Sequence, residues 1–217
     1  QWPTVSYLMS LCRRNWNFSK WLTASALMEW TSSQFFIIAS GVYLGAVAVG
    51  AMRACQNIMG ALHVLFYGLE NVVPIRAAKI LHIDGVRAML RYLRQVIVFG
   101  GGLSALFAAL IAGTPEFWLR SIYGEEFIAY GFVLQWYALI YLLIFLGTPL
   151  RAGLQALEYT KPRFWAYVLA TIFTFILYAP LIGNLGLLGA MIGLLCINLI
   201  LRGFMIVAFT KRIKSLL

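Results

Sequence analysis

Six apolar segments constrain the fold of this chain more than any other feature of its sequence. A membrane-spanning helix needs about 20 mainly apolar residues, because lipid offers no hydrogen-bond partner to the backbone. Composition agrees with spans of this kind, since hydrophobic residues make up 62% of the chain and charged residues only 11%. We therefore predict an all-α integral membrane protein, a bundle of six transmembrane helices. The spans are expected at residues 21–41, 46–74, 96–114, 131–150, 164–182 and 187–209.

The chain before the first span mixes basic and aromatic side chains, as in the run RRNWNFSKW. This mixture is typical of a headgroup interface, and it leads directly into a membrane span, which makes nucleic-acid binding the weaker interpretation. The expected organisation is a cytoplasmic linker or interfacial segment (residues 1–20), a six-helix transmembrane lobe (21–210) and a cytoplasmic tail (211–217).

The connection between the second and third spans is basic and amphipathic. Asp84 can cap a helix in which Arg87, Arg91 and Arg94 share one face and apolar side chains the other. This pattern therefore predicts that residues 76–94 form a helix that lies on the membrane surface. The remaining connections are expected to be a tight turn at 42–45, a longer acidic loop at 115–130 and a turn at 183–186.

Basic residues in the connections fall almost entirely on one side of the predicted membrane. That side carries fourteen Lys and Arg residues, at positions 13, 14, 20, 76, 79, 87, 91, 94, 151, 161, 163, 211, 212 and 214, whereas the other side carries Arg120 alone. The positive-inside rule then places both termini in the cytoplasm. This asymmetry accounts for the net charge of +10 without a nucleic-acid partner.

The second span carries polar residues along one helical face. At 100° per residue, they fall in an arc of roughly 140°. A helix surrounded by lipid would not tolerate this face, because charged groups in hydrocarbon cost several kcal/mol each. The face must meet other helices in a packed interface or line a water-filled cavity. Its members are Arg53, Gln56, Asn57, Gly60, His63, Tyr67, Glu70, Asn71 and Pro74.

Charged side chains also occur inside the predicted spans. Glu29 and Arg53 lie on the order of 10 Å from the nearer membrane boundary, at ~1.5 Å rise per residue, and they could pair with each other. Glu70 and Arg202 lie nearer the cytoplasmic edge, where a long side chain can extend to the interface. The amides of Gln34 and Asn198 are expected to form hydrogen bonds between helices.

Residues for catalysis or metal binding are sparse. Asp84 is the only aspartate, and the sequence has no HExxH or P-loop motif and no Ser/His/Asp set. His63 and His82 are isolated, and Cys12, Cys55 and Cys196 are too scattered to indicate a disulfide framework or a zinc site. We predict a protein that is not an enzyme and that uses no metal or cofactor.

Two runs carry a resemblance to a known family. The first is LGAVAVGAMRACQNIMGALHVLFYGLENVVPIRAAK with the basic connector after it; the second is IYGEEFIAYGFVLQWYAL followed by GTPLRAGLQALEYTKPRF. Together they resemble bacterial polysaccharide and lipid-linked oligosaccharide flippases of the multidrug/oligosaccharidyl-lipid/polysaccharide exporter superfamily. The likeness extends over nearly the whole chain from about Trp16.

The resemblance implies one lobe, most like the C-terminal one, of a transporter with two six-helix lobes around a cavity that opens alternately to each side. The missing N-terminal lobe would be its partner, and the lack of an initiator Met agrees with a fragment. The implied location is the bacterial cytoplasmic (inner) membrane. The implied process is polysaccharide biosynthesis, including lipopolysaccharide or exopolysaccharide.

The implied cargo is a lipid-linked glycan with an anionic pyrophosphate, moved from the inner to the outer leaflet. Cationic and amide side chains would replace the water that such a headgroup loses. The helical-face argument then nominates Arg53, Gln56, Asn57 and His63 for the substrate path, with Arg202 in reserve.

Two alternatives stay open. A cation-coupled exporter of drugs or small metabolites would use acidic groups deep in the helices, for which Glu29 and Glu70 are the candidates, unless these serve in charge pairing. A membrane scaffold of a polysaccharide-export complex, without transport activity, is also compatible with the glycine-rich helix contacts.

Overall fold

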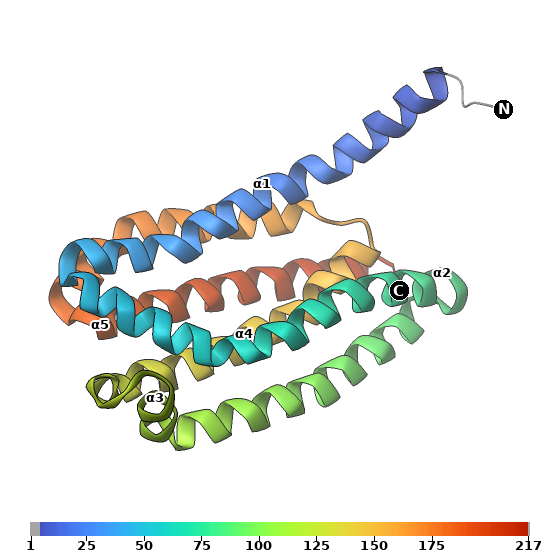
Figure 1. Ribbon diagram of the computed structural model, residues 1–217. Coiled ribbons are helices and arrows are strands. Elements are labelled where there is room, and N and C mark those ends of the chain that lie inside the picture. Colours follow the sequence, from blue (N-terminus) through green and yellow to red (C-terminus); the bar gives the residue numbers. More distant parts are fainter. Residues whose placement is uncertain (1–4, 217) are drawn as a thin grey trace.

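The computed structural model describes the backbone of residues 5–216 and the side chains of residues 16, 19, 20, 23–32 and 34–216. The predictions that concern residues 1–4 and the side chains of Cys12, Arg13 and Arg14 lie outside these described residues. The described part of the chain forms helices and contains no strand. In order these are α1 (Val5–Leu44), α2 (Ala46–Gly113), α3 (Pro115–Tyr123), the 3-10 helix η1 (Glu125–Tyr130), α4 (Gly131–Ala156) and α5 (Lys161–Lys214) (Figure 1).

Two of the long helices reverse direction at a glycine. α2 turns at Gly85 (φ 80°) and α5 turns at Gly186 (φ 58°), so each forms two antiparallel arms (Figure 1). Gly45 (φ 83°) makes the turn between α1 and α2. Glycine suits these positions because a Cβ atom disfavours positive φ. The resulting six long helical runs confirm the predicted all-α bundle.

Length and composition mark three of the described helical stretches as able to cross a membrane. They are α2, the run Glu125–Ala156 that joins η1 to α4, and α5. Because α2 and α5 each double back, these three stretches provide five passes across the bundle. Large exposed apolar side chains on the outside of the second arm of α2 include Val98, Phe99 and Leu106. An exterior of this kind is stable in lipid rather than in water.

Three predicted connections differ from the structure. The prediction of a surface helix at residues 76–94 is wrong. These residues form the ends of the two α2 arms, which meet at Gly85. The expected loop at 115–130 is instead α3 and η1, whose first turns contain Glu116, Glu125 and Glu126. The turns expected at 42–45 and 183–186 are reduced to single non-helical glycines, because the flanking residues stay helical.

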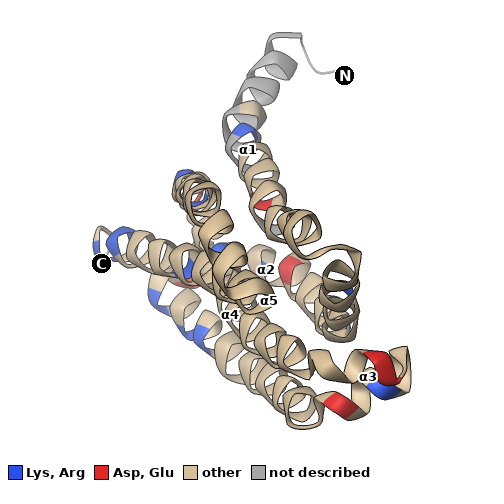
Figure 2. Ribbon diagram, turned by 90° about the vertical axis from the view of Figure 1, so that its left-hand side faces the viewer, with Lys and Arg blue, Asp and Glu red and all other residues tan. Residues whose placement is uncertain are grey.

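The connections divide between two ends of the bundle. One end, here called the basic end, contains the Gly85 turn, the α4–α5 connection at residues 157–160 and the end of α5 (Figure 1). The opposite end contains the Gly45 and Gly186 turns together with α3 and η1. Lys and Arg lie mainly toward the distant basic end in Figure 2, and the acidic residues of α3 and η1 lie at the near end. The cytoplasmic assignment of the basic end stays a prediction.

Close helix contacts hold the bundle together. The first arm of α2 packs along α4, and α1 packs along α5. Gly193 of α5 lies so close to the buried ring of Phe36 in α1 that a Cβ atom there would collide with it. Small residues such as glycine permit this close approach between membrane helices. The two helix pairs leave a space between them, where the polar face of α2 lies.

Candidate functional site: a polar cavity between the helices

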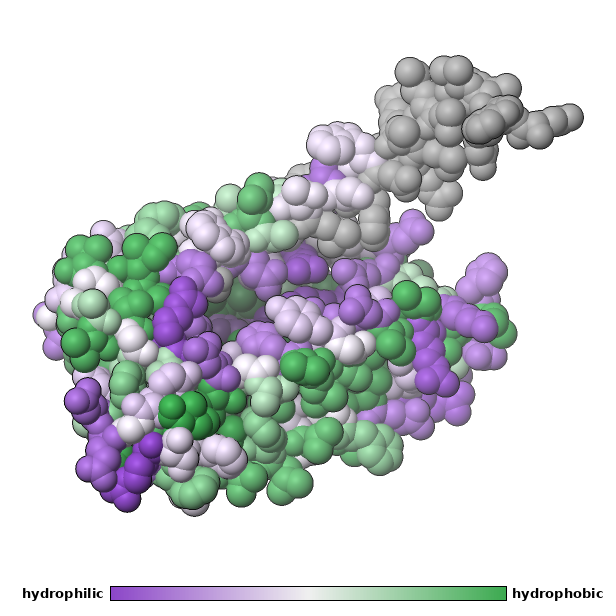
Figure 3. All heavy atoms as spheres, in the orientation of Figure 1, coloured by the Kyte–Doolittle hydropathy of each residue, from purple (hydrophilic) through white to green (hydrophobic). Residues whose placement is uncertain are grey.

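A cavity of about 680 Å³ lies between the helices. Its walls come from α1, the first arm of α2, α4 and α5, and the space-filling view shows a hydrophilic hollow on the side of the bundle (Figure 3). The polar and charged residues that line it are Glu29, Ser32, Gln34, Arg53, Gln56, Asn57, His63, Tyr67, Glu70, Tyr137, Tyr141, Arg151, Arg163, Tyr167, Asn198 and Arg202.

The polar face of α2 lines this cavity along most of its length. Of the nine residues predicted to share that face, all except Asn71 and Pro74 belong to the lining. The structure thus decides between the two readings of the face, in favour of a cavity over a packed interface. All seven site residues proposed from the sequence meet here, namely Arg53, Gln56, Asn57, His63, Arg202, Glu29 and Glu70. What each residue does in the cavity remains a prediction.

Arg53 lies toward the end of the cavity opposite the basic end. Its Nη1 donates to Gln56 Oε1 at 3.1 Å, and its Nη2 donates to Gln34 Oε1 at 2.7 Å across the α1–α2 gap. The second bond confirms that Gln34 joins two helices. Among the described residues, no carboxylate forms an ion pair with Arg53. Its full positive charge is therefore available, held in place by neutral amides.

Hydrogen bonds also tie this face of α2 to α3 and α4. Asn57 Nδ2 donates to the hydroxyl of Tyr123 in α3 at 3.2 Å. Further along α2, the Nδ1 atom of His63 lies 3.0 Å from the hydroxyl of Tyr141 in α4. The His63 and Tyr141 rings meet edge to face, with centroids 4.9 Å apart. These contacts fix the orientation of the α2 side chains before any ligand binds.

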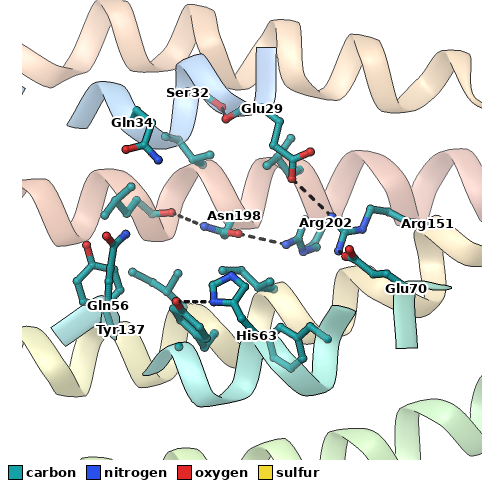
Figure 4. Close-up of a pocket in the computed structure, with 18 of the residues that line it drawn as sticks. Glu29, Ser32, Gln34, Gln56, His63, Glu70, Tyr137, Arg151, Asn198 and Arg202 are labelled. Atoms are coloured by element: carbon teal, nitrogen blue, oxygen red, sulfur yellow. Dashed lines mark hydrogen bonds and ion pairs between the residues drawn. The ribbon is translucent and has the colours of Figure 1, made fainter. Parts of the chain in front are cut away.

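Four charged side chains, those of Glu29, Glu70, Arg151 and Arg163, meet toward the basic end of the cavity. Figure 4 shows Glu29, Glu70 and Arg151. Arg151 pairs with Glu70 and also lies 3.6 Å from Glu29, whereas Arg163 donates to Glu29 at 3.0 Å. Arg151 is largely buried, with 11% of its side chain exposed, because it reaches into the cavity from α4. Charge pairing in this cluster therefore links α1, α2, α4 and α5 at that end of the cavity.

Arg202 lies beside the cluster and has no carboxylate partner among the described residues. Its Nε donates to the carbonyl of Leu143 at 2.8 Å, and its Nη2 donates to Asn198 Oδ1 at 3.2 Å. The residue is only 6% exposed, and its Nη1 has no hydrogen-bond partner in the structure. An unsatisfied donor on a buried cation is costly. This atom is itself buried, and it lies close to Gly147 of α4.

Several predicted contacts are corrected by this geometry. Glu29 does not pair with Arg53, because the two arginines at the basic end occupy its carboxylate. Arg202 does not extend to the membrane interface, because it is buried against α4. Asn198 does not join two helices among the described residues, since both of its hydrogen bonds there stay within α5.

The sequence reasoning missed Arg151 and Arg163. Both were assigned to a cytoplasmic connection, but Arg151 lies within α4 and Arg163 in the first turn of α5. A signal was present, because a carboxylate inside a span requires a cation nearby. The sequence contains two such carboxylates, Glu29 and Glu70, and it carries arginines at the end of α4 and the start of α5 that could pair with them.

The cavity carries an excess of positive charge. Four arginines and two glutamates line it, and the two glutamates are engaged by Arg151 and Arg163. The described residues contain no cluster of three or more His, Cys, Asp or Glu side chains that could hold a metal ion. The arrangement therefore offers hydrogen-bond donors and unneutralised cations to a ligand.

A membrane-spanning helical bundle with a polar, charged cavity between its helices is an architecture that membrane transporters use. The sequence model of the MatE family matches residues 22–181, well over half of the chain, and the chain belongs to this family of membrane exporters. No curated protein and no solved structure matched the chain.

Proposed function

We propose that this chain forms part of a flippase that moves a lipid-linked oligosaccharide or polysaccharide precursor from the inner to the outer leaflet of a bacterial inner membrane. Transport would proceed by alternating access, with the cavity as the path of the polar headgroup. Both termini are placed in the cytoplasm under this proposal. It rests on the family resemblance and on the charges that line the cavity.

The observation that carries the proposal is the state of the charged groups in the cavity. Both carboxylates are paired with arginines, whereas Arg53 and Arg202 face the cavity without an acidic partner among the described residues. Two uncompensated guanidinium groups favour an anionic ligand, because they supply fixed charges and donor forks that match phosphate oxygens.

The cavity also suits the sugar part of such a cargo. Amides and hydroxyl groups line it between the two free arginines, including those of Gln56, Asn198 and Tyr141. These groups can exchange hydrogen bonds with the hydroxyls of a glycan and so replace its hydration. The hollow opens on the side of the bundle, which lets a lipid tail stay in the bilayer while the headgroup enters (Figure 3).

The same opening implies a covering partner. Charged groups facing hydrocarbon cost several kcal/mol each, so another protein surface must shield the hollow when no cargo is present. We propose that a second, preceding lobe fulfils this role, as the resemblance to two-lobe exporters implies.

A cation-coupled exporter of drugs or small metabolites is the second candidate. It is favoured by one observation, the partial exposure of Glu29 (37% of its side chain) and Glu70 (38%) within the cavity. An entering proton or cationic drug would have to displace an arginine from either carboxylate. This competition makes the anionic cargo the better match. A scaffold without transport activity would leave the two arginines of the cavity that have no acidic partner among the described residues, Arg53 and Arg202, without a role.

Replacing Arg53 tests the proposal. Arg53→Ala should abolish transport of a lipid-linked glycan and leave folding intact, because the side chain is exposed and pairs only with neutral amides. Arg53→Lys should restore part of the activity, since charge survives but the donor fork does not. Transport and thermal midpoint are measured together in the full product of the gene.

Glu125→Gln is the matched control, because it removes a charge at an exposed position outside the cavity. It should leave transport unchanged. Normal transport by Arg53→Ala would refute a cargo role for this residue. Loss of transport together with a large fall in thermal midpoint would favour a purely structural role.

A further inference from the structure

A second pocket lies at the basic end, away from the main cavity. Its volume is about 430 Å³, and it is formed by the two arms of α2 on either side of the Gly85 turn. Its residues recur at helical spacing, with one set on each arm, so the arms face each other across it. The lining residues are Arg76, Ile80 and Asp84 from the first arm, and Ala88, Arg91, Tyr92 and Gln95 from the second.

The charges in this pocket are not neutralised by the protein. Arg76, Arg91 and Asp84 are all exposed, and none of them forms an ion pair with another described side chain. Arg76 instead lies over the ring of Tyr92, with its guanidinium carbon 5.8 Å from the ring centroid. That contact spans the two arms and holds one guanidinium at the pocket.

The surroundings of the pocket match the boundary between headgroups and acyl chains. Ile75, next to Arg76, is 74% exposed, and Val98, three residues after Gln95, is 59% exposed. Both arms continue from these positions into the apolar runs of α2. An amphiphile with its polar group in the pocket would therefore keep its hydrocarbon chains against apolar helix surface.

We propose that this pocket binds the headgroup of a phospholipid that carries a phosphate and a primary ammonium group, as in phosphatidylethanolamine. Arg76 and Arg91 take the phosphate, because guanidinium groups match its oxygens, and Gln95 adds a neutral donor. Asp84 takes the ammonium group. Asp84 would repel a headgroup that carries only negative charge, so its carboxylate selects a zwitterionic headgroup. The site is independent of the cargo proposed for the main cavity.

Lipid competition on the full chain tests this site. The protein is equilibrated in detergent with equal amounts of phosphatidylethanolamine and phosphatidylglycerol of the same chain length, and bound lipids are counted by native mass spectrometry. Arg91→Gln should lower retention of both lipids roughly tenfold, since a charge-assisted contact is lost. Arg76→Gln should do the same and provides a second variant if the first folds poorly.

Arg87→Gln is the matched control, because it removes an equal charge from an exposed position on the same arm that does not line the pocket. It should change retention less than about twofold, as expected of a screened surface charge. Asp84→Asn should leave binding of the phosphate intact but reduce the preference for phosphatidylethanolamine by roughly threefold.

Three results would overturn the site. Equal losses in Arg91→Gln and Arg87→Gln would show diffuse attraction of lipid to a basic surface. An unchanged lipid preference in Asp84→Asn would remove the role of the carboxylate. Displacement of the lipid by an equal concentration of soluble glycerophosphoethanolamine would identify a site for free phosphate esters rather than for a membrane lipid.

Discussion

Gly147 has no side chain, and the guanidinium group of Arg202 occupies the space that a side chain there would need. A Cβ atom at position 147 would lie 2.5 Å from the Nε and Cζ atoms of Arg202, and both residues are buried. Because the guanidinium is fixed by Leu143 and Asn198, it cannot move aside without losing those hydrogen bonds. Gly147 therefore holds Arg202 in the wall of the cavity.

Gly147→Ala should lower the thermal midpoint by several degrees, corresponding to about 1.5–3 kcal/mol for the disturbed charge-assisted bonds. In an Arg202→Ala background the same change should be neutral or stabilising, because alanine is the better helix former. Gly102→Ala is the control, since no atom lies within 4 Å of the Cβ position there. A large loss in the Arg202→Ala background would show that Gly147 serves another contact.

Arg151 neutralises two carboxylates from different helices. Arg151→Gln should lower the free energy of unfolding by about 2 kcal/mol, a value between those for exposed and fully buried ion pairs. The change leaves Glu70 without a cationic partner, whereas Glu29 keeps Arg163. Adding Glu70→Gln should recover part of this loss. Thermal unfolding of the two single variants and the double variant measures the coupling. Additive losses would contradict a direct pairing.

Some of these residues could be predicted from the sequence and others could not. The polar face of α2 was predictable because residues at helical spacing share a face whatever the helix packs against. The pairing of Arg151 with Glu29 and Glu70 was not, because it depends on how three helices approach one another. The burial of Arg202 was missed for the same reason, since its partner carbonyl comes from Leu143 in another helix.

Among the elements, the connection around Gly85 shows where sequence patterns are ambiguous. Basic and apolar residues alternate there with helical periodicity, and this pattern is the same for a surface helix and for two helix ends that meet at a turn. The difference lies in the positive φ of one glycine, which no periodicity reveals. The six spans themselves were predictable, because their length and hydropathy follow from the bilayer.

The arrangement of the elements makes a topology prediction. Residue 125 in η1 and residue 215 after α5 lie at opposite ends of the bundle, and both side chains are exposed. In a background without native cysteines, Glu125→Cys should react with an impermeant thiol reagent in intact cells. Ser215→Cys should react only after the membrane is broken. The reverse pattern would invert the proposed orientation, and labelling of both from outside would contradict the even number of spans.

The lateral opening of the cavity predicts that transport depends on a second protein surface that covers the opening. The 217-residue chain, reconstituted as a demonstrated monomer, should not flip a fluorescent lipid-linked glycan, because its charged wall would face lipid. Restoring activity by adding a second membrane lobe would support this view. Efficient flipping by the monomer would refute it.

We propose that the cavity carries an anionic, lipid-linked headgroup. Proteoliposomes that contain the full product of the gene provide the test. The measurement compares the flipping rates of one fluorescent glycan on two lipid carriers, one that includes a diphosphate and one that lacks it. The diphosphate cargo should move at least tenfold faster, a difference that Arg53→Ala removes. Equal rates for the two cargoes, or transport only of cationic dyes driven by an ion gradient, would contradict the proposed function.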